Sequence, residues 1–123
     1  MLVDPHPTHT ALVIAAASIW RDALVSLMRA QPGWRVSQVL DSAREVQSVL
    51  ARSAPDVIII ESGNDESTLP DFIAWLHETH VAVRCVVAVD THPQQSRYLA
   101  AGADATLLKG CLDEASLHQA VAG

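Results

Sequence analysis

The sequence predicts a single α/β domain in which a parallel five-stranded sheet is covered by helices on both faces. Short apolar segments alternate with amphipathic segments five times along the 123 residues, which is the pattern of repeated strand–helix units. Several of the apolar segments lack polar alternation, as expected for strands that are buried on both faces. The composition is 50% hydrophobic, which is enough for one sizeable core.

The first unit follows a polar, proline-containing start. We expect residues 1–10 to form a flexible N-terminal segment and residues 11–123 to form the domain. An unbroken apolar run predicts a buried strand at residues 11–16. Ser18 is a suitable N-cap for the next helix, and Pro32-Gly33 ends that helix. Its apolar residues recur at helical spacing as Ile19, Ala23 and Leu27, beside Trp20, Leu24 and Met28.

The second and third units repeat the pattern. A strand is predicted at residues 34–40, followed by a helix that Asp41 or Ser42 caps. The run of β-branched residues within 56–61 is the clearest buried strand of the chain. A polar loop, residues 62–67, follows this strand. The apolar faces of the two helices are Ala43, Val46, Val49 and Leu50, and then Leu69, Phe72, Ile73 and Leu76.

The last two units complete the five repeats. The fourth strand is predicted within residues 81–89, and its helix begins at His92-Pro93 and ends near Gly102. A short fifth strand is predicted at residues 103–108. The last helix spans 112–121, and we expect it to turn Leu117, Ala120 and Val121 inward.

Candidate functional residues lie where the predicted strands end, because parallel sheets of this kind place their functional crevice at the carboxyl ends of the strands. Glu61 and Lys109 close two strands that we expect to be neighbours. A carboxylate and an ammonium that face one crevice can pair directly. The alternative is that Glu61 points into water from a surface loop.

Several stretches of the chain resemble the receiver domain of two-component response regulators. The similarity is greatest to the nitrate-regulator type, in which the domain precedes a helix-turn-helix effector, and it covers about residues 11–122. The strand order that we expect is 2-1-3-4-5, the flavodoxin-like doubly wound arrangement. The stretches that carry the resemblance are Trp20–Leu24, Gln31–Trp34, Pro55–Ile60, Ala101–Asp104 and Leu107–Lys109.

The resemblance implies a phosphoacceptor site that has lost its chemistry. In the family, a pair of acidic residues after the first strand holds Mg²⁺ together with an acceptor Asp. Here Ala15 and Ala16 occupy the acidic positions. Neither can bind a cation, so we expect no metal site and no Mg²⁺-dependent phosphorylation. The other matching positions are Glu61 for the acceptor, Lys109 for the family's lysine, Val89 (or Asp90) for the hydroxyl residue, and Thr106 for the aromatic switch.

These departures predict an atypical receiver, or pseudo-receiver, that signals without phosphate, Mg²⁺ or any cofactor. We expect it to act as a protein interaction or dimerisation module and not as an enzyme. It fits the N-terminal part of a transcription regulator whose effector domain would follow Gly123. Glu61, paired with Lys109, would then mimic the phosphorylated acceptor and fix one signalling state. As in the family, the partner surface is expected on the last two helices and the fifth strand, among Tyr98, Leu99, Thr106, Leu117 and His118.

Charge and composition exclude other classes of function. The net charge of -6 argues against direct binding to nucleic acid or anionic lipid. No apolar run reaches the roughly 18 residues of a membrane span, and a cytoplasmic location is expected. His77 and His80 share a helix face, but we expect them to be solvated and not to bind metal. Two alternatives stay open: a flavodoxin-like ligand-sensing domain, and a receiver that is phosphorylated by another route.

Overall fold

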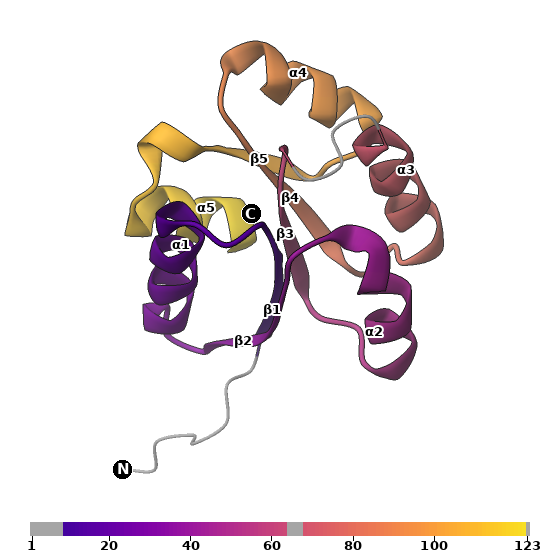
Figure 1. Ribbon diagram of the computed structural model, residues 1–123, viewed down its shortest axis with the longest axis horizontal. Helices are drawn as coiled ribbons and strands as arrows, with labels where there is room; N and C mark the ends of the chain where they lie inside the picture. The colour runs from indigo at the N-terminus through magenta and orange to yellow at the C-terminus, as the bar shows by residue number, and fades with distance from the viewer. Residues whose placement is uncertain (1–8, 64–67, 123) are drawn as a thin grey trace.

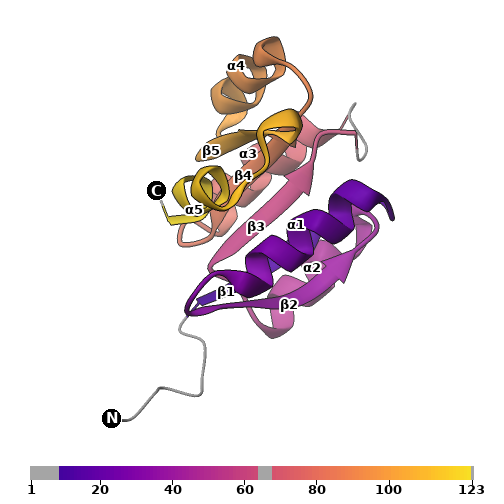
Figure 2. The same ribbon diagram turned by 90° about the vertical axis from the view of Figure 1, so that its left-hand side faces the viewer.

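The computed structural model describes residues 9–63 and 68–122, which form one sheet with helices on both faces (Figure 1). The five strands are parallel and lie in the order β2-β1-β3-β4-β5, as expected (Figure 2). The strands are β1 (His9–Ile14), β2 (Trp34–Leu40), β3 (Val57–Glu61), β4 (Arg84–Val89) and β5 (Ala105–Leu108).

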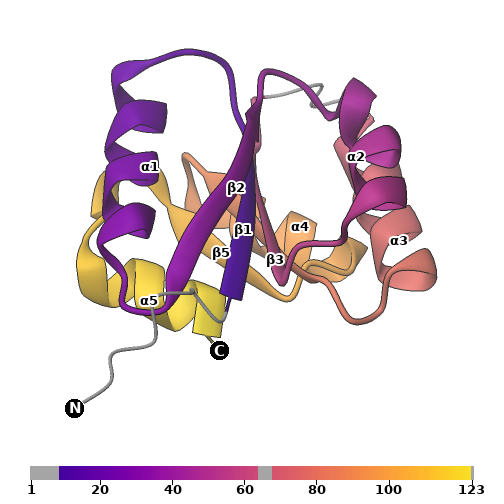
Figure 3. The same cartoon turned by 90° about the horizontal axis from the view of Figure 1, so that it is seen from below.

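The helices form two layers around the sheet. Figure 3 shows α1 and α5 on one side of the sheet, and α2 and α3 on the other. α4 packs beside α3, on the same side as α2. The helices are α1 (Ile19–Ala30), α2 (Val46–Arg52), α3 (Leu69–Thr79), α4 (His92–Ala101) and α5 (Glu114–Ala122). Within the described residues, none of these helices has the length and apolar character needed to cross a membrane.

The hydrophobic core is divided by the sheet into two clusters. Successive side chains of a strand point to opposite faces. Ile58 and Ile60 therefore pack toward α2, α3 and α4, whereas Ile59 packs toward α1 and α5. All three are at most 1% exposed. The apolar runs without alternation were thus correctly interpreted as strands that are buried on both faces.

The start of the domain differs from the sequence-based expectation. β1 begins at His9, so the last two residues of the predicted flexible segment belong to the sheet. Asp56 holds this start in place, because its carboxylate accepts a 2.7 Å hydrogen bond from the backbone N–H of Thr10. The remaining residues of that segment, 1–8, lie outside the described part of the chain.

The helix boundaries follow the predicted caps. Ser18 accepts a 3.0 Å hydrogen bond from the backbone N–H of Arg21 and so begins α1. Ser42 caps a short 3-10 turn, Ala43–Glu45, that leads into α2. At the end of α4, Gly102 has φ 118°, a conformation that favours glycine.

Only one of the two apolar stripes that the sequence offers for α1 faces the sheet. Leu24 and Met28 are fully buried, whereas Ile19 is 90% exposed. Both sets of residues have helical spacing, and only the position of the sheet distinguishes them. The inward stripe is therefore the one that contains Leu24 and Met28.

Candidate functional site

The carboxyl ends of β3 and β5 bring Glu61 and Lys109 together. Glu61 is the last residue of β3, and Lys109 follows the last residue of β5. The Lys109 Nζ lies 2.7 Å from Glu61 Oε2, and the two side chains are 23% and 12% exposed. This geometry is a direct ion pair, so the alternative of a solvated Glu61 is wrong.

The two strands are not neighbours, however, which corrects the sequence-based expectation. β4 lies between them and pairs with both. Glu61 is opposite Ala88 in the β3–β4 register. Because Ala88 has a small side chain, β4 places little bulk between the two charged groups. The contact depends on the length of the Glu61 and Lys109 side chains, which lets them meet across an intervening strand.

Lys109 has two further partners at the site. Its Nζ lies 3.6 Å from Asp90 Oδ1 and 5.1 Å from the centre of the Trp20 ring. Burial alone would lower the pKa of Lys109. The hydrogen bonds and charges of Glu61 and Asp90 outweigh burial, so the pKa lies above its ordinary value. Lys109 is therefore a fully charged group that is already engaged by protein side chains.

The end of β1 offers no carboxylate to a cation. Ala15 is fully buried and Ala16 is exposed. The guanidinium of Arg21 is bound beside them, since its Nη1 donates to the Ala15 carbonyl at 3.1 Å and to Asp41 Oδ1 at 2.8 Å. Across residues 9–63 and 68–122, no three His, Cys, Asp or Glu side chains cluster in a way that could hold a metal ion.

Val89 and Asp90, the two residues that the resemblance aligns with the family's hydroxyl residue, carry no hydroxyl group. Val89, the last residue of β4, is fully buried in the cluster that faces α2, α3 and α4. Asp90 follows it and is exposed. Of the two alignments considered from the sequence, the Asp90 position is thus the one that reaches Lys109.

Thr106, the residue of β5 that the resemblance aligns with the family's aromatic switch, is hydrogen-bonded to α4. Gln95 Nε2 donates a 3.1 Å hydrogen bond to the Thr106 hydroxyl. Both residues line a hollow between α4 and α5, together with Gln119 and Ser116 of α5. Gln95 and Gln119 were missed by the sequence analysis, because a glutamine on an amphipathic helix has no distinctive pattern.

The expected partner surface needs correction. Tyr98 and Leu117 are fully buried, so they belong to the core and not to a surface. His118 is exposed, but it lines hollows beside α1 and the start of β1, away from β5. Leu99 is 46% exposed, and Thr106 is partly exposed. Inward and outward faces of these short helices have similar spacing, which explains the mistake.

Trp20 and Arg21 were also missed as site residues, although they belong to a stretch that carries the family resemblance. Both lie in the first turn of α1, which follows the end of β1 directly. Their position in the chain could have indicated a role at the site, because the first turn of such a helix borders the carboxyl ends of the strands. Their roles depend on side-chain direction, which residue spacing does not show.

Comparison with solved structures identifies the fold as that of receiver domains. The receiver domain of the response regulator NarL from Mycobacterium tuberculosis superposes with a TM-score of 0.80 at 17% identity, covering 96% of this chain and 95% of that one. A LuxR-family DNA-binding response regulator from Staphylococcus aureus gives 0.73 at 18% identity, with 89% and 93% covered.

A third similar structure belongs to a protein that is named for a different cellular process. It is a pilus assembly-related protein from Burkholderia pseudomallei, which is similar with a TM-score of 0.74 at 18% identity and covers 99% of this chain and 96% of that one. No protein-family model matches the sequence, and no curated protein does. The comparisons thus show the receiver fold, at sequence identities that leave function to the site itself.

Proposed function

We propose that this chain is a pseudo-receiver domain that signals by binding protein partners, independently of phosphorylation and Mg²⁺. The observation that carries the proposal is the 2.7 Å contact between Lys109 Nζ and Glu61 Oε2. In the receiver family, lysine at this position serves the acceptor carboxylate and its phosphate. Here the ammonium is already bound by a carboxylate one methylene longer than Asp.

Transfer of a phosphoryl group needs positive charge around the phosphoryl oxygens. In this domain, Ala15 and Ala16 supply no metal ligand, and the two nearby cations already have carboxylate partners. Arg21 is bound to Asp41, and Lys109 is bound to Glu61. These contacts support a site in which protein charges replace the metal and the phosphate.

We propose further that Glu61 mimics the phosphorylated acceptor and holds the domain in one signalling state. The hydrogen bond between Gln95 and Thr106 supports this idea, because it links α4 to the strand in which the family's aromatic switch would move. A threonine held in this way has no large ring to reorient. The surface of α4, β5 and α5 would then present one arrangement to a partner or to a second copy.

The proposal is tested by incubation with acetyl phosphate and Mg²⁺, followed by intact mass measurement. We expect no gain of a phosphoryl group and no change in sedimentation. A phosphorylatable receiver domain treated in parallel serves as the positive control. A stoichiometric gain in mass that disappears in Glu61→Gln would contradict the proposal and support a receiver with an unusual acceptor.

The wider setting is part of the same proposal. A LuxR-type effector domain, as in the similar regulator from Staphylococcus aureus, would make this domain the N-terminal part of a transcription regulator. The net charge of -6 supports contact with protein and not with nucleic acid. The homodimer and the cytoplasmic location stay predictions from the sequence.

A further inference from the structure

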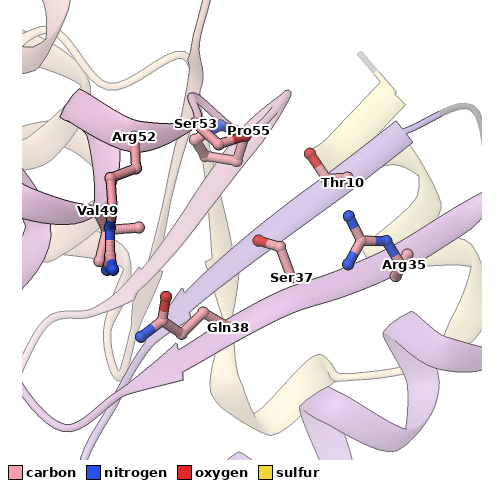
Figure 4. A pocket seen from close by; sticks show the side chains of 8 residues that line it. All are labelled: Thr10, Arg35, Ser37, Gln38, Val49, Arg52, Ser53 and Pro55. Atoms are coloured by element: carbon pink, nitrogen blue, oxygen red, sulfur yellow. The ribbon is translucent and has the colours of Figure 1, made fainter.

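A hollow with two arginines lies between α2 and the edge of the sheet, far from the strand ends described above. Its volume is about 310 Å³. Figure 4 shows Arg35, Ser37 and Gln38 of β2 on one side, and Val49 and Arg52 of α2 on the other. α2 is short and ends at Arg52. Thr10 and Arg35 stand early in β1 and β2, so the hollow lies toward the amino ends of these strands.

The two arginines have no partner for their charge among the described residues. The guanidinium groups of Arg35 and Arg52 form no hydrogen bond or ion pair with any residue in the described part of the chain, and both residues are exposed. No Asp or Glu is among the residues that line the hollow. In contrast, Arg21 and Lys109 at the other end of the sheet are paired with carboxylates.

The chain as a whole is acidic, with 8 Lys and Arg against 14 Asp and Glu. The nearest acidic group shown by the contacts is Asp56, whose carboxylate is already used by the backbone N–H of Thr10 at 2.7 Å. An anion in the hollow would face both positive charges, which no carboxylate of the lining neutralises.

The remaining lining is suited to an oxyanion. Ser53 provides a hydroxyl group and Gln38 an amide, both of which can donate hydrogen bonds. The Thr10 hydroxyl also lines the hollow, but it already points to Asp56 Oδ2 at 3.5 Å. The Ser37 hydroxyl is already used, since it donates to the Ala11 carbonyl at 3.2 Å. A guanidinium binds phosphate or carboxylate oxygens through two parallel N–H groups.

We propose that this hollow binds a small organic anion that carries phosphate or carboxylate groups, held between Arg35 and Arg52. The volume lies at the lower end of the roughly 300–1,000 Å³ typical of ligand sites, which favours a compact molecule. This site is separate from the paired charges of Glu61 and Lys109. The inference therefore does not depend on the proposed function.

The test is a titration of the ¹⁵N-labelled chain with inorganic pyrophosphate and, separately, with citrate, at constant ionic strength. We expect saturable amide shifts at Thr10, Gln38 and Ser53 with at least one of them. The anion that binds more tightly distinguishes a phosphate ligand from a carboxylate ligand. Arg35→Gln and Arg52→Gln should each weaken binding about tenfold, because a hydrogen bond to a charged group is lost.

Arg29→Gln is the matched control, since Arg29 is an exposed arginine of α1 on the opposite face of the sheet. It should leave the affinity within about twofold, as expected for a distant surface charge. The spectrum of each variant without anion shows whether it is folded. Absence of saturation with both anions, equal weakening by all three variants, or binding of acidic peptides alone would each overturn the inference.

Discussion

At Lys109, one ammonium group meets two carboxylates and an indole ring. The Glu61 contact at 2.7 Å is close and largely shielded from solvent, whereas Asp90 lies at 3.6 Å and its side chain is 60% exposed. Shielding strengthens a charge pair, and solvent weakens it. Glu61 is therefore the dominant partner, and the two contacts provide a comparison within one site.

We predict a coupling free energy of about 1–2 kcal/mol between Glu61 and Lys109, above that of a surface pair and below the cost of breaking a fully buried pair. The measurement is a double-mutant cycle with Glu61→Gln and Lys109→Met, followed by urea unfolding. The matched cycle with Asp90→Asn should give less than about 1 kcal/mol. Strictly additive effects for Glu61 and Lys109 would show that the ion pair contributes nothing.

The pH dependence of this pair follows from the raised pKa of Lys109. A group whose pKa is higher in the folded state stabilises the protein fully below its unfolded-state value of 10.5. The contribution is lost as the pH rises through the folded-state pKa. The stability difference between wild type and Lys109→Met should thus be constant near neutral pH and shrink above that value. A difference that instead grows with alkaline pH would contradict the assignment.

The two cysteines differ in their exposure to solvent. Cys85 lies within β4, and burial, with a smaller effect of Asp104, raises the pKa of its thiol to about 12. Cys111 is exposed. Because the thiolate is the reactive form, we predict that a thiol reagent at pH 8 labels Cys111 quickly and Cys85 only after unfolding. Cys111→Ser should remove the fast phase, and fast labelling that persists in this variant would contradict the prediction.

At the scale of the elements, the residues next to a helix end predicted where the helix begins or ends better than apolar spacing predicted which face of the helix is buried. The Ser18 cap, the proline at the start of α4 and Gly102 at its end all act through the backbone next to them, and sequence shows such effects directly. The orientation of α1, in contrast, depends on where the sheet lies. Ile19 and Leu24 both fit a helical stripe, yet only Leu24 is buried.

The Ser18 cap provides a test at this scale. Ser18→Ala removes the acceptor for the Arg21 backbone N–H and should lower the free energy of unfolding by about 1 kcal/mol. Ser26→Ala is the control, because Ser26 is exposed within the same helix and alanine is a good helix former there. Thermal and urea unfolding of both variants measure the difference. Equal effects of the two substitutions would show that the cap does not contribute.

For the whole molecule, the alternation of strands and helices predicted the fold class, because buried parallel strands leave a strong apolar signal, and the resemblance to receiver domains implied the strand order. The site was only partly predictable. The pairing of Glu61 with Lys109 was expected from their strand ends, although not across β4. Trp20, Arg21 and Gln95 were missed, because their contacts depend on side-chain directions that arise only when distant segments pack together.

The two core clusters lead to the last prediction. They lie on opposite faces of one sheet, with Ile73 of α3 in one cluster and Ile59 of β3 in the other. A buried Ile→Ala costs roughly 2–5 kcal/mol, a large part of the 5–15 kcal/mol typical of a domain. Ile→Val removes only one methylene, and each such change should cost about 0.5–1.5 kcal/mol.

Ile59→Val and Ile73→Val remove atoms that pack in separate clusters, so their effects should add to within about 0.5 kcal/mol. Both clusters share the same strands, so the double variant should still unfold in a single transition by circular dichroism and tryptophan fluorescence. Transitions that differ between the two probes would mean that the faces unfold separately. A coupling free energy above about 1 kcal/mol would instead mean that the sheet transmits packing changes from one face to the other.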